Sequence, residues 1–257
     1  MSLGAAGRRH HLRRSVRRVV SALVRGRLAE LRSGDAAVNA RNLLFGLDRG
    51  HCPVCGYSGT FLQYAGRRRQ ICPSCESRSR HRVIFRALAD RRPEPYVLGL
   101  HIAPEACLTP ILETYGEHLL TGDLEPGVGA SALDLRALPI RDGALDFFFA
   151  SHVMEHVDED RRALSEIYRV LRPGGLAILV VPITAEATVE FGEVRADLNF
   201  HARDCGPDYF ERYTEAGFEV DLVRSDELEG KDEQALTTLD NGREVVHWIP
   251  FCRKPSP

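Results

Sequence analysis

The stretch VLGLHIAPEA, residues 97–106, joins a short apolar run to a turn and the start of a helix. A strand that leads through a turn into a helix is typical of α/β domains that bind nucleotides. Glycines usually occupy that turn, because the backbone has to approach the ligand closely. Here His101, Ala103, Pro104 and Glu105 stand in it. The stretch therefore predicts a nucleotide-type site with an unusual lining.

From residue 95 onward, apolar runs alternate with helical patterns. This order predicts an α/β fold, a Rossmann-like and mostly parallel sheet with helices on both faces. The predicted strands cover residues 96–102, 118–123, 131–135, 144–151, 175–182, 218–223 and 244–252, and the predicted helices lie near 105–115, 158–171 and 207–216. Ligands of such sheets bind at the carboxyl ends of the strands.

Polar residues stand where these predicted strands end. Asp123 follows the first turn by about 20 residues, the position from which a carboxylate binds the two hydroxyls of a ribose. Asp134 offers an acceptor for an exocyclic amine, and Leu135 offers cover for an adenine face. Ser151 and His152 end the fourth strand. Together these residues predict an adenosine pocket with space beyond it.

The run from Asp123 to Pro182 resembles class I S-adenosylmethionine-dependent methyltransferases of the type 11 kind. LPIRDGALD, EHV and LRPGG stand where that family has its motifs, and the resemblance covers roughly residues 95–252. A subgroup of the family is also similar in having a zinc ribbon in front, an HIAPE turn and a DLEPG segment. The resemblance implies S-adenosyl-L-methionine as cofactor, with contacts from His101, Ala103, Glu105, Asp123, Leu124, Asp134, Leu135 and Ser151.

The sequence departs from the family pattern in two places. Of the turn positions where the family has glycines, only Ala103 is small, and ten residues between Asp123 and Asp134 leave no room for a crossover helix. We expect a loop there instead. We expect Glu105 to bind the ammonium of the cofactor and the following helix to attract its carboxylate. The alternative is that Glu105 only stabilises the first turn of that helix.

A hydroxyl acceptor requires a general base. His152 and His201 are the candidate catalytic residues, because both are expected on the acceptor side of the site. Glu155 and His156 match a family motif, and in that family residues at these positions more often support the turn after the fourth strand than take part in the chemistry. Arg203 is a candidate for binding an anionic acceptor, and its alternative role is an ion pair with Asp204.

Two cysteine pairs stand close together in CPVCG, residues 52–56, and CPSCE, residues 72–76. Two such pairs at this spacing predict a tetrahedral zinc site, whereas a single pair would equally fit a redox motif. Four cysteine ligands close the site to substrate, so the predicted Zn²⁺ is structural. Its ligands are Cys52, Cys55, Cys72 and Cys75, while we expect Cys107, Cys205 and Cys252 to be ordinary buried residues.

Charge is divided unevenly along the 257 residues. Residues 1–92 hold twenty arginines, no lysine and five acidic residues, whereas the remainder holds fourteen basic and thirty-one acidic residues. This division predicts a basic interaction segment on an acidic body, or two parts that bind each other. Residues 67–69, on an expected hairpin between the cysteine pairs, and the basic residues after 76 would form a phosphate-binding face or a solvated charge run.

These patterns predict three parts: a basic amphipathic helical arm (1–48), a zinc ribbon with a connecting helix (49–92) and a methyltransferase domain (93–257). The arm has apolar residues at helical spacing, and it would contact an anionic membrane, a second subunit or its own domain. No apolar run is long enough for a membrane span, and the N-terminal segment does not fit a secretory signal. We therefore expect a cytoplasmic protein, with the inner membrane face as a peripheral site.

Three functions are compatible with this sequence. The first is O- or N-methylation of a small molecule or glycan, which is the setting of many bacterial members of the similar subgroup. The second is methylation of ribosomal or transfer RNA, with the basic ribbon holding the RNA; the acidic body and scarce aromatic residues of the ribbon argue against it. The third is an inactive adaptor, against which the acidic residues at the strand ends argue.

Overall fold

The computed structural model describes residues 33–228, 238–240 and 243–256. The chain forms two compact units. We call them the ribbon unit, residues 33–89 with the described part of 228–246, and the sheet unit, residues 90–227 with 247–256. The apolar stripe predicted for the basic arm falls within residues 1–32 and so lies outside the described residues. The division at residues 48 and 92 stays a prediction.

The ribbon unit consists of short hairpins that carry the two cysteine pairs. Its elements are α2 (Ser33–Phe45), β1 (Arg49–His51), β2 (Ser58–Thr60), β3 (Leu62–Tyr64), β4 (Arg67–Ile71), β13 (Thr238–Asp240) and β14 (Arg243–Val245). The backbone repeats itself at the two cysteine turns, where the amide of Cys52 donates to Tyr57 and that of Cys72 to Ser77. The predicted hairpin with Arg67–Arg69 is confirmed as β3 and β4.

A buried arginine supports the second cysteine turn. Arg82, in α3 (Ser79–Arg91), donates through Nη1 to the carbonyls of Gln70 and Ser77, at 3.2 and 2.9 Å. Its Nη2 donates to the carbonyl of Arg69, and the guanidinium lies over the ring of Phe61. Buried polar groups are costly unless they are paired, so these bonds fix the hairpin on α3.

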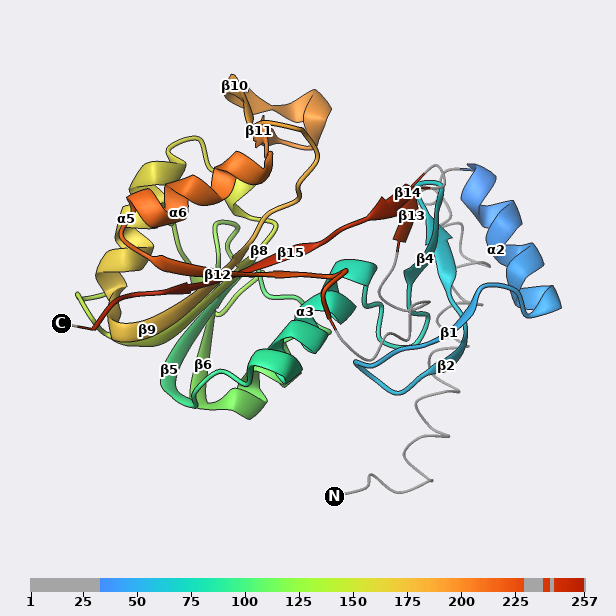
Figure 1. Ribbon diagram of the computed structural model, residues 1–257, viewed down its shortest axis with the longest axis horizontal. Helices are drawn as coiled ribbons and strands as arrows, with labels where there is room; N and C mark the ends of the chain where they lie inside the picture. Colours follow the sequence, from blue (N-terminus) through green and yellow to red (C-terminus); the bar gives the residue numbers. More distant parts are fainter. Residues whose placement is uncertain (1–32, 229–237, 241–242, 257) are drawn as a thin grey trace. The chain divides into compact units, whose positions relative to one another are not determined.

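The sheet unit contains a seven-stranded sheet in the order β12–β15–β9–β8–β5–β6–β7 (Figure 1). Only β15 runs antiparallel to its neighbours in this sheet, and the predicted mostly parallel sheet is confirmed. The strands are β5 (Tyr96–Ile102), β6 (Gly116–Asp123), β7 (Ser131–Ala132), β8 (Leu145–Ser151), β9 (Leu171–Val180), β12 (Glu219–Arg224) and β15 (Trp248–Arg253). All seven predicted strands therefore exist, but the strand predicted at 244–252 begins only at Trp248, because residues 243–245 form β14 of the ribbon unit.

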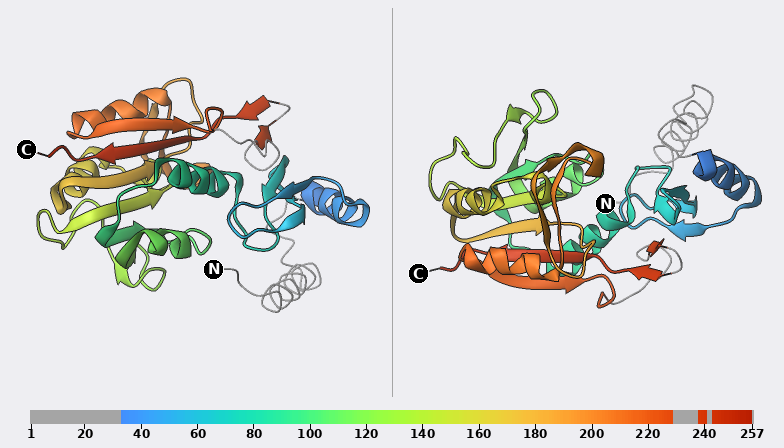
Figure 2. Two further views of the ribbon diagram at one scale, coloured as in Figure 1. Left: turned by 60° about the horizontal axis from the view of Figure 1, so that its bottom comes forward. Right: turned by 90° about the horizontal axis from the view of Figure 1, so that it is seen from above.

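Helices cover both faces of this sheet. α5 (Asp160–Val170) and α6 (Glu211–Glu215) lie on one side, and the segment of α4 (Thr109–Leu112) and η2 (Glu113–Tyr115) lies on the other (Figures 1 and 2). α5 turns Ala163, Leu164 and Ile167 into the core at helical spacing. η5 (Pro207–Phe210) precedes α6, so the predicted helix at 207–216 is divided into two turns of different kind.

The helix predicted at 105–115 is wrong in its first half. Residues 106–108 form a turn, and the helix begins only at Thr109, with Pro110 near its first position. Proline favours this position, because its ring fits the first turn of a helix and its missing amide is not needed there. The helix that was expected to attract the cofactor carboxylate is thus four residues long and starts after Glu105.

The connection from β6 to β7 is confirmed as a loop. Residues 124–130 contain no helix, and the loop folds back onto β6 so closely that a Cβ on Gly129 would lie 2.8 Å from the backbone of Gly122. The amide of Ala130 donates to the hydroxyl of Thr121, and the amide of Leu133 donates to the carbonyl of Asp123. Small residues therefore let a short loop replace the usual crossover.

A hairpin of β10 (Val189–Arg195) and β11 (His201–Asp204) follows β9 and was not predicted. Arg203 anchors it to the turn after β8. Its side chain is 2% exposed, and it donates to the carbonyls of Met154, Val157 and Asp158 at 2.6–3.0 Å. Its Nε also bonds to Glu190. The expected anion-binding role of Arg203 and its pair with Asp204 are therefore not supported, since its N–H groups are used within the fold.

We expect Arg203→Lys to lower the free energy of unfolding by about 3 kcal/mol, because a lysine cannot reach three carbonyls at once and leaves buried acceptors unpaired. Urea unfolding measures this. The control is Arg195→Lys in the same hairpin, whose pair with Asp197 is exposed and whose loss should cost under about 0.5 kcal/mol. Equal effects of the two substitutions would show that Arg203 is not an anchor.

Candidate cofactor site and histidine cluster

Three parallel strands end side by side in the middle of the sheet. In the register, Ile102 of β5 lies between Gly122 of β6 and Ala150 of β8. Chain order reverses at β5, because β6 lies on one side and β8 on the other. Ligands of open α/β sheets bind outside the carboxyl ends at such a switch point. The predicted residues Ala103, Asp123 and Ser151 follow or end these strands, so the fold brings them to one edge.

Ala103 takes the backbone conformation that a glycine usually supplies. Its φ is 51°, in the left-handed region, and its amide donates to the carbonyl of Gly122 at 2.8 Å. Residues other than glycine rarely adopt this conformation, and they do so mainly where the surrounding structure requires it. The turn after β5 has therefore kept a glycine-like path without a glycine.

His101 lies beneath this turn and is fully buried. Its Nδ1 is 3.2 Å from the hydroxyl of Thr109, and its ring meets Phe149 edge-on at 4.9 Å. Burial lowers the pKa of His101 to about 4, although the nearby carboxylate of Glu105 acts in the opposite direction. The imidazole is therefore neutral at neutral pH. Its Nε2 is buried without a hydrogen-bond partner among the described residues.

The second strand presents its carboxylate at the same edge. Asp123 is half-buried, and its Oδ1 accepts a hydrogen bond from the amide of Glu125 at 2.8 Å. That bond orients the carboxyl group, because it fixes one oxygen to the backbone two residues on. The neighbouring Leu124 is 71% exposed, so an apolar side chain stands free beside the carboxylate.

Asp134 and Leu135, which were predicted to contact an adenine base, both have partners within the fold. The carboxylate of Asp134 accepts bonds from the backbone and side chain of Arg136, and these bonds lower the pKa of Asp134. Leu135 is buried and packs within the main core. Their roles toward an adenine base stay predictions.

The end of β8 is a strained turn with polar side chains. Ser151 is buried, and its hydroxyl has no hydrogen-bond partner among the described residues. His152 has a φ of 56°, and its amide donates to the carbonyl of Val180 on β9. Its Nδ1 lies 3.2 Å from Oε1 of Glu155. The unpartnered atoms at Ser151 and His101 leave this edge with buried polar groups that no described residue satisfies.

Glu155, His156 and His201 form what we call the histidine cluster. Glu155 and His156 belong to η3 (Met154–His156), and His201 begins β11. One ligand atom from each of the three lies within 4.8 Å of the others, and the two imidazole rings meet edge-on at 4.8 Å. Of the two predicted catalytic residues, the structure thus brings His201 into this cluster, while His152 contacts it through Glu155. Sequence reasoning missed the cluster because no pattern placed residue 201 beside 155.

The four predicted zinc ligands lie together in the ribbon unit. Sγ of Cys52 is 3.7 Å from that of Cys75, and Sγ of Cys55 is 3.7 Å from that of Cys72. Sulfurs on a tetrahedron with Zn–S bonds of about 2.3 Å would be about 3.8 Å apart, so the donor set and spacing fit zinc. Hydrogen bonds among the thiols lower the pKa of Cys52 and raise that of Cys72.

Of the other cysteines, Cys205 and Cys252 are confirmed as buried, whereas Cys107 is partly exposed.

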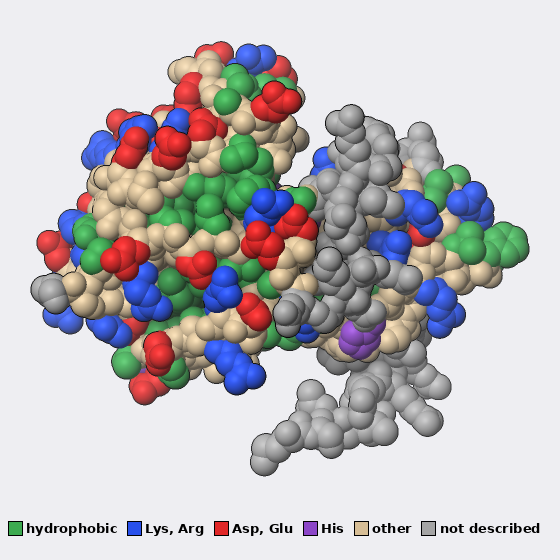
Figure 3. All heavy atoms as spheres, in the orientation of Figure 1, with side chains coloured by type: hydrophobic (Ala, Val, Ile, Leu, Met, Phe, Trp, Pro, Cys, Tyr) green, Lys and Arg blue, Asp and Glu red, His purple; other side chains and the backbone are tan. Residues whose placement is uncertain are grey.

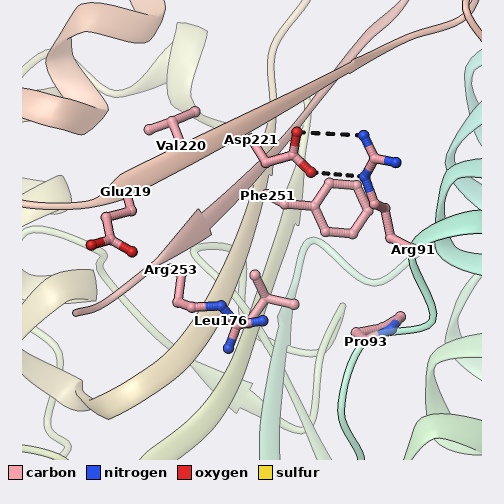
Figure 4. Close-up of a pocket in the computed structure, with 8 residues that line it drawn as sticks. All are labelled: Arg91, Pro93, Leu176, Glu219, Val220, Asp221, Phe251 and Arg253. Carbon is pink, nitrogen blue, oxygen red and sulfur yellow. Dashed lines mark hydrogen bonds and ion pairs between the residues drawn. The ribbon is translucent and has the colours of Figure 1, made fainter. Parts of the chain in front are cut away.

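A hollow of about 290 Å³ lies at the opposite end of the sheet from the strand carboxyl ends (Figure 4). Within it, the guanidinium of Arg91 pairs with Asp221 at 2.7 Å, so its principal charges neutralise each other. It offers no group to the site described above.

No helix among the described residues is long and apolar enough to cross a bilayer.

The comparison with known families matches residues 84–179 to the methyltransferase domain. A malonyl-[acyl-carrier protein] O-methyltransferase of Serratia marcescens is 32% identical over 97 residues, 38% of this chain and 33% of that protein. A ubiquinone/menaquinone biosynthesis C-methyltransferase of Methylobacterium nodulans is 36% identical over 93 residues, 36% of this chain and 34% of that protein.

The chain spans about a fifth of the length of the first curated relatives that it matches. Among solved structures, a 1,6-didemethyltoxoflavin N1-methyltransferase of Burkholderia thailandensis with bound S-adenosylhomocysteine has a TM-score of 0.49 at 16% identity, over 69% of this chain and 79% of that one. The matched segment runs from α3 through the central strands to β9, which include the switch point. Residues 84–179, which include β5, β6, β7 and β8 and most of β9, are therefore similar to a methyltransferase domain.

Proposed function

We propose that this protein transfers the methyl group of S-adenosylmethionine to a small-molecule or glycan acceptor. The observation that supports it most is the meeting of β5, β6 and β8 at the switch point, with Asp123 at one strand end and His152 at another. When bound, S-adenosylmethionine supplies an electrophilic methyl group on a sulfonium. The chain's task is then chiefly to hold the acceptor atom in line with that methyl.

Residues at the first two strand ends would hold the cofactor. The carboxylate of Asp123, oriented by the amide of Glu125, is suited to two ribose hydroxyls. Glu105 stands before α4, not within its first turn, so helix stabilisation no longer accounts for its charge. We assign it to the cofactor's ammonium. Ala103 gives the backbone path that lets the ligand approach.

Residues at the third strand end would serve the acceptor. An O- or N-methylated acceptor loses a proton, and the turn after Ser151 offers His152 and the histidine cluster as groups that could accept it. The strained φ of His152 fixes its backbone beside the proposed cofactor position. His152 and His201 stay our candidates for catalytic residues.

An RNA acceptor is the second candidate, and the charge of the ribbon unit favours it. Arginines predominate among the charged side chains that Figure 3 displays there, whereas both signs are interspersed over the sheet unit. Several arginines of the ribbon unit, however, have partners within the fold. Arg82 is buried among carbonyls, Arg68 pairs with Asp48, and Arg78 stacks on Tyr64. Because these side chains already have partners, fewer cations and aromatic rings are available to bind a nucleic acid than the sequence suggests.

The ribbon unit would hold one structural Zn²⁺ through Cys52, Cys55, Cys72 and Cys75. Its own buried core is small, consisting of Phe61 and the two buried cysteines with a few partly buried neighbours. A unit of this size gains much of its folding free energy from a bound metal.

We expect S-adenosylhomocysteine to bind at micromolar concentrations, and Asp123→Ala to weaken this binding by about 2 kcal/mol, as for loss of a charged hydrogen bond. Isothermal calorimetry measures it. Glu125→Ala is the matched control, because it removes an exposed acid two residues away and leaves the backbone bond to Asp123 in place. Unchanged affinity in Asp123→Ala would exclude Asp123 from the site, and no binding by the parent chain would favour the inactive adaptor.

Glu105→Gln keeps the size of the side chain and removes its charge. We expect it to weaken S-adenosylhomocysteine binding about tenfold, or roughly 1.4 kcal/mol. Methylthioadenosine has the same adenosine and no amino acid, so its binding should not change. Equal losses for both ligands would mean that Glu105 supports the fold, and no loss for either would remove the carboxylate from the cofactor site.

Cys72→Ser should lower the zinc content by one ion per chain and unfold residues 50–80, while the sheet unit stays folded. Elemental analysis gives the zinc content, and hydrogen exchange locates the unfolding. Cys107→Ser serves as the control, because it removes a thiol in the sheet unit and should leave both measurements unchanged. Zinc-free protein from a purification without chelator would contradict the proposed metal.

A further inference from the structure

The carboxylate of Glu155 is buried without the partners that a charge requires. Its side chain is 1% exposed, and neither oxygen accepts a hydrogen bond from any described residue. The buried guanidinium of Arg203 donates its Nη1 and Nη2 to backbone carbonyls of the same turn. The groups within ion-pair distance of Glu155 are two imidazoles, His152 at 3.2 Å and His156 at 3.8 Å. A buried carboxylate in this setting is costly unless a cation joins it.

The hydrogen bond of His156 determines which of its nitrogens faces the carboxylate. Nδ1 lies 3.1 Å from the carbonyl oxygen of Phe200, and a carbonyl only accepts, so Nδ1 carries the proton. In the neutral imidazole, Nε2 therefore presents a lone pair toward Oε1 of Glu155, 3.8 Å away. Two acceptors face each other across a gap that a metal ion would fill.

His201 has a similar arrangement on the other side of the cluster. Its Nδ1 lies 3.5 Å from Oδ1 of Asp204, which favours the proton on that nitrogen and leaves Nε2 as a lone pair. Histidines that bind metals nearly always donate their second nitrogen to a carboxylate or a carbonyl in this way. Both histidines of the cluster thus have the outer partner that a ligand histidine has.

We propose that Glu155, His156 and His201 bind a divalent transition-metal cation. Two imidazoles and one carboxylate are a donor set that holds Mn²⁺, Fe²⁺ or Zn²⁺ and leaves coordination positions open. The open side faces solvent, since His156 is 37% and His201 17% exposed above the buried Glu155. One ligand atom from each residue lies within 4.8 Å of the others, so modest rotation of the imidazoles brings all three to a common ion.

The position of this ion indicates that the methyl acceptor is a hydroxyl compound, an inference that rests on the proposed function. Glu155 follows Ser151, at the end of β8, by four residues, so the ion would lie close to the strand end to which we assigned the acceptor. The ion would lower the pKa of an acceptor hydroxyl bound there, and the hydroxyl gives its proton to His152, the other candidate base. Its oxygen then forms the bond to the methyl carbon, the carbon–sulfur bond breaks, and S-adenosylhomocysteine leaves with that electron pair. The acceptor is then a hydroxyl compound, and His201 serves as a ligand of the ion and not as a base.

Manganese binding tests the site on the full chain that carries one zinc ion, which fills the cysteine site and leaves the histidine cluster empty; thiolates also disfavour Mn²⁺. Electron paramagnetic resonance of free Mn²⁺ should show one bound ion per chain. Glu155→Gln and His201→Ala should each weaken Mn²⁺ binding at least about tenfold. His118→Ala, at an exposed histidine on β6, is the matched control and should bind like the parent. No Mn²⁺ bound by the parent, or equal affinity in all variants, would overturn the proposal.

Two further measurements separate folding and cofactor binding from ligation. Zinc content and the urea midpoint of each variant show whether it has folded, and Asp204→Asn, which keeps all three ligands, should weaken Mn²⁺ binding by a smaller factor. Calorimetry with S-adenosylhomocysteine is independent of the ion. Manganese binding with this ligand pattern in a chain that does not bind S-adenosylhomocysteine would refute the proposed function and leave the metal site standing, and the reverse result would refute the metal site alone.

Discussion

The parallel pairing of β5 with β6 on one side and β8 on the other determines where everything else in the sheet unit can lie. Because all three strands run the same way, their carboxyl ends meet at one edge, and their following turns must leave in different directions. Buried side chains such as Leu100 and Phe148 hold this centre together. The candidate site is therefore a consequence of strand order, and its polar groups occupy the edge that the core does not use.

The two turns at this edge are held in unusual backbone conformations by their neighbours. Ala103 and His152 both have positive φ, and each donates its amide to a carbonyl on an adjacent strand, at Gly122 and Val180. Such conformations cost about 1–3 kcal/mol each and persist where surrounding contacts compensate. A glycine is thus dispensable at 103, because the hydrogen bond to β6 enforces a path that glycine would take without strain.

The protein has two groups of metal-type ligands that differ in chemistry and surroundings. The four thiols of the ribbon unit are soft donors in a closed arrangement, which suits a structural ion. Glu155 and its histidines are harder donors with an exposed side, which suits an ion that exchanges ligands. Arg203 supports the second group by donating to the carbonyls of Met154 and Val157, on either side of Glu155.

The sequence by itself determined the features that depend on local patterns. Apolar periodicity located all seven strands, the short spacing between Asp123 and Asp134 excluded a crossover helix, and the spacing of Cys52 and Cys55 from the second cysteine pair predicted their cluster. These signals are readable because neighbouring residues alone produce them.

Only the tertiary structure decided how distant residues combine. The start of α4 at Thr109, the engagement of Asp134 by Arg136, the internal role of Arg203 and the meeting of Glu155 with His201 all depend on contacts beyond local spacing. Residues 155 and 201 meet because β10 and β11 fold back on the turn after β8, and no periodicity in the intervening chain records that return. A burial, a hydrogen bond or a ligand pair made across 46 positions is a property of the packed fold, and local sequence carries no signal for it.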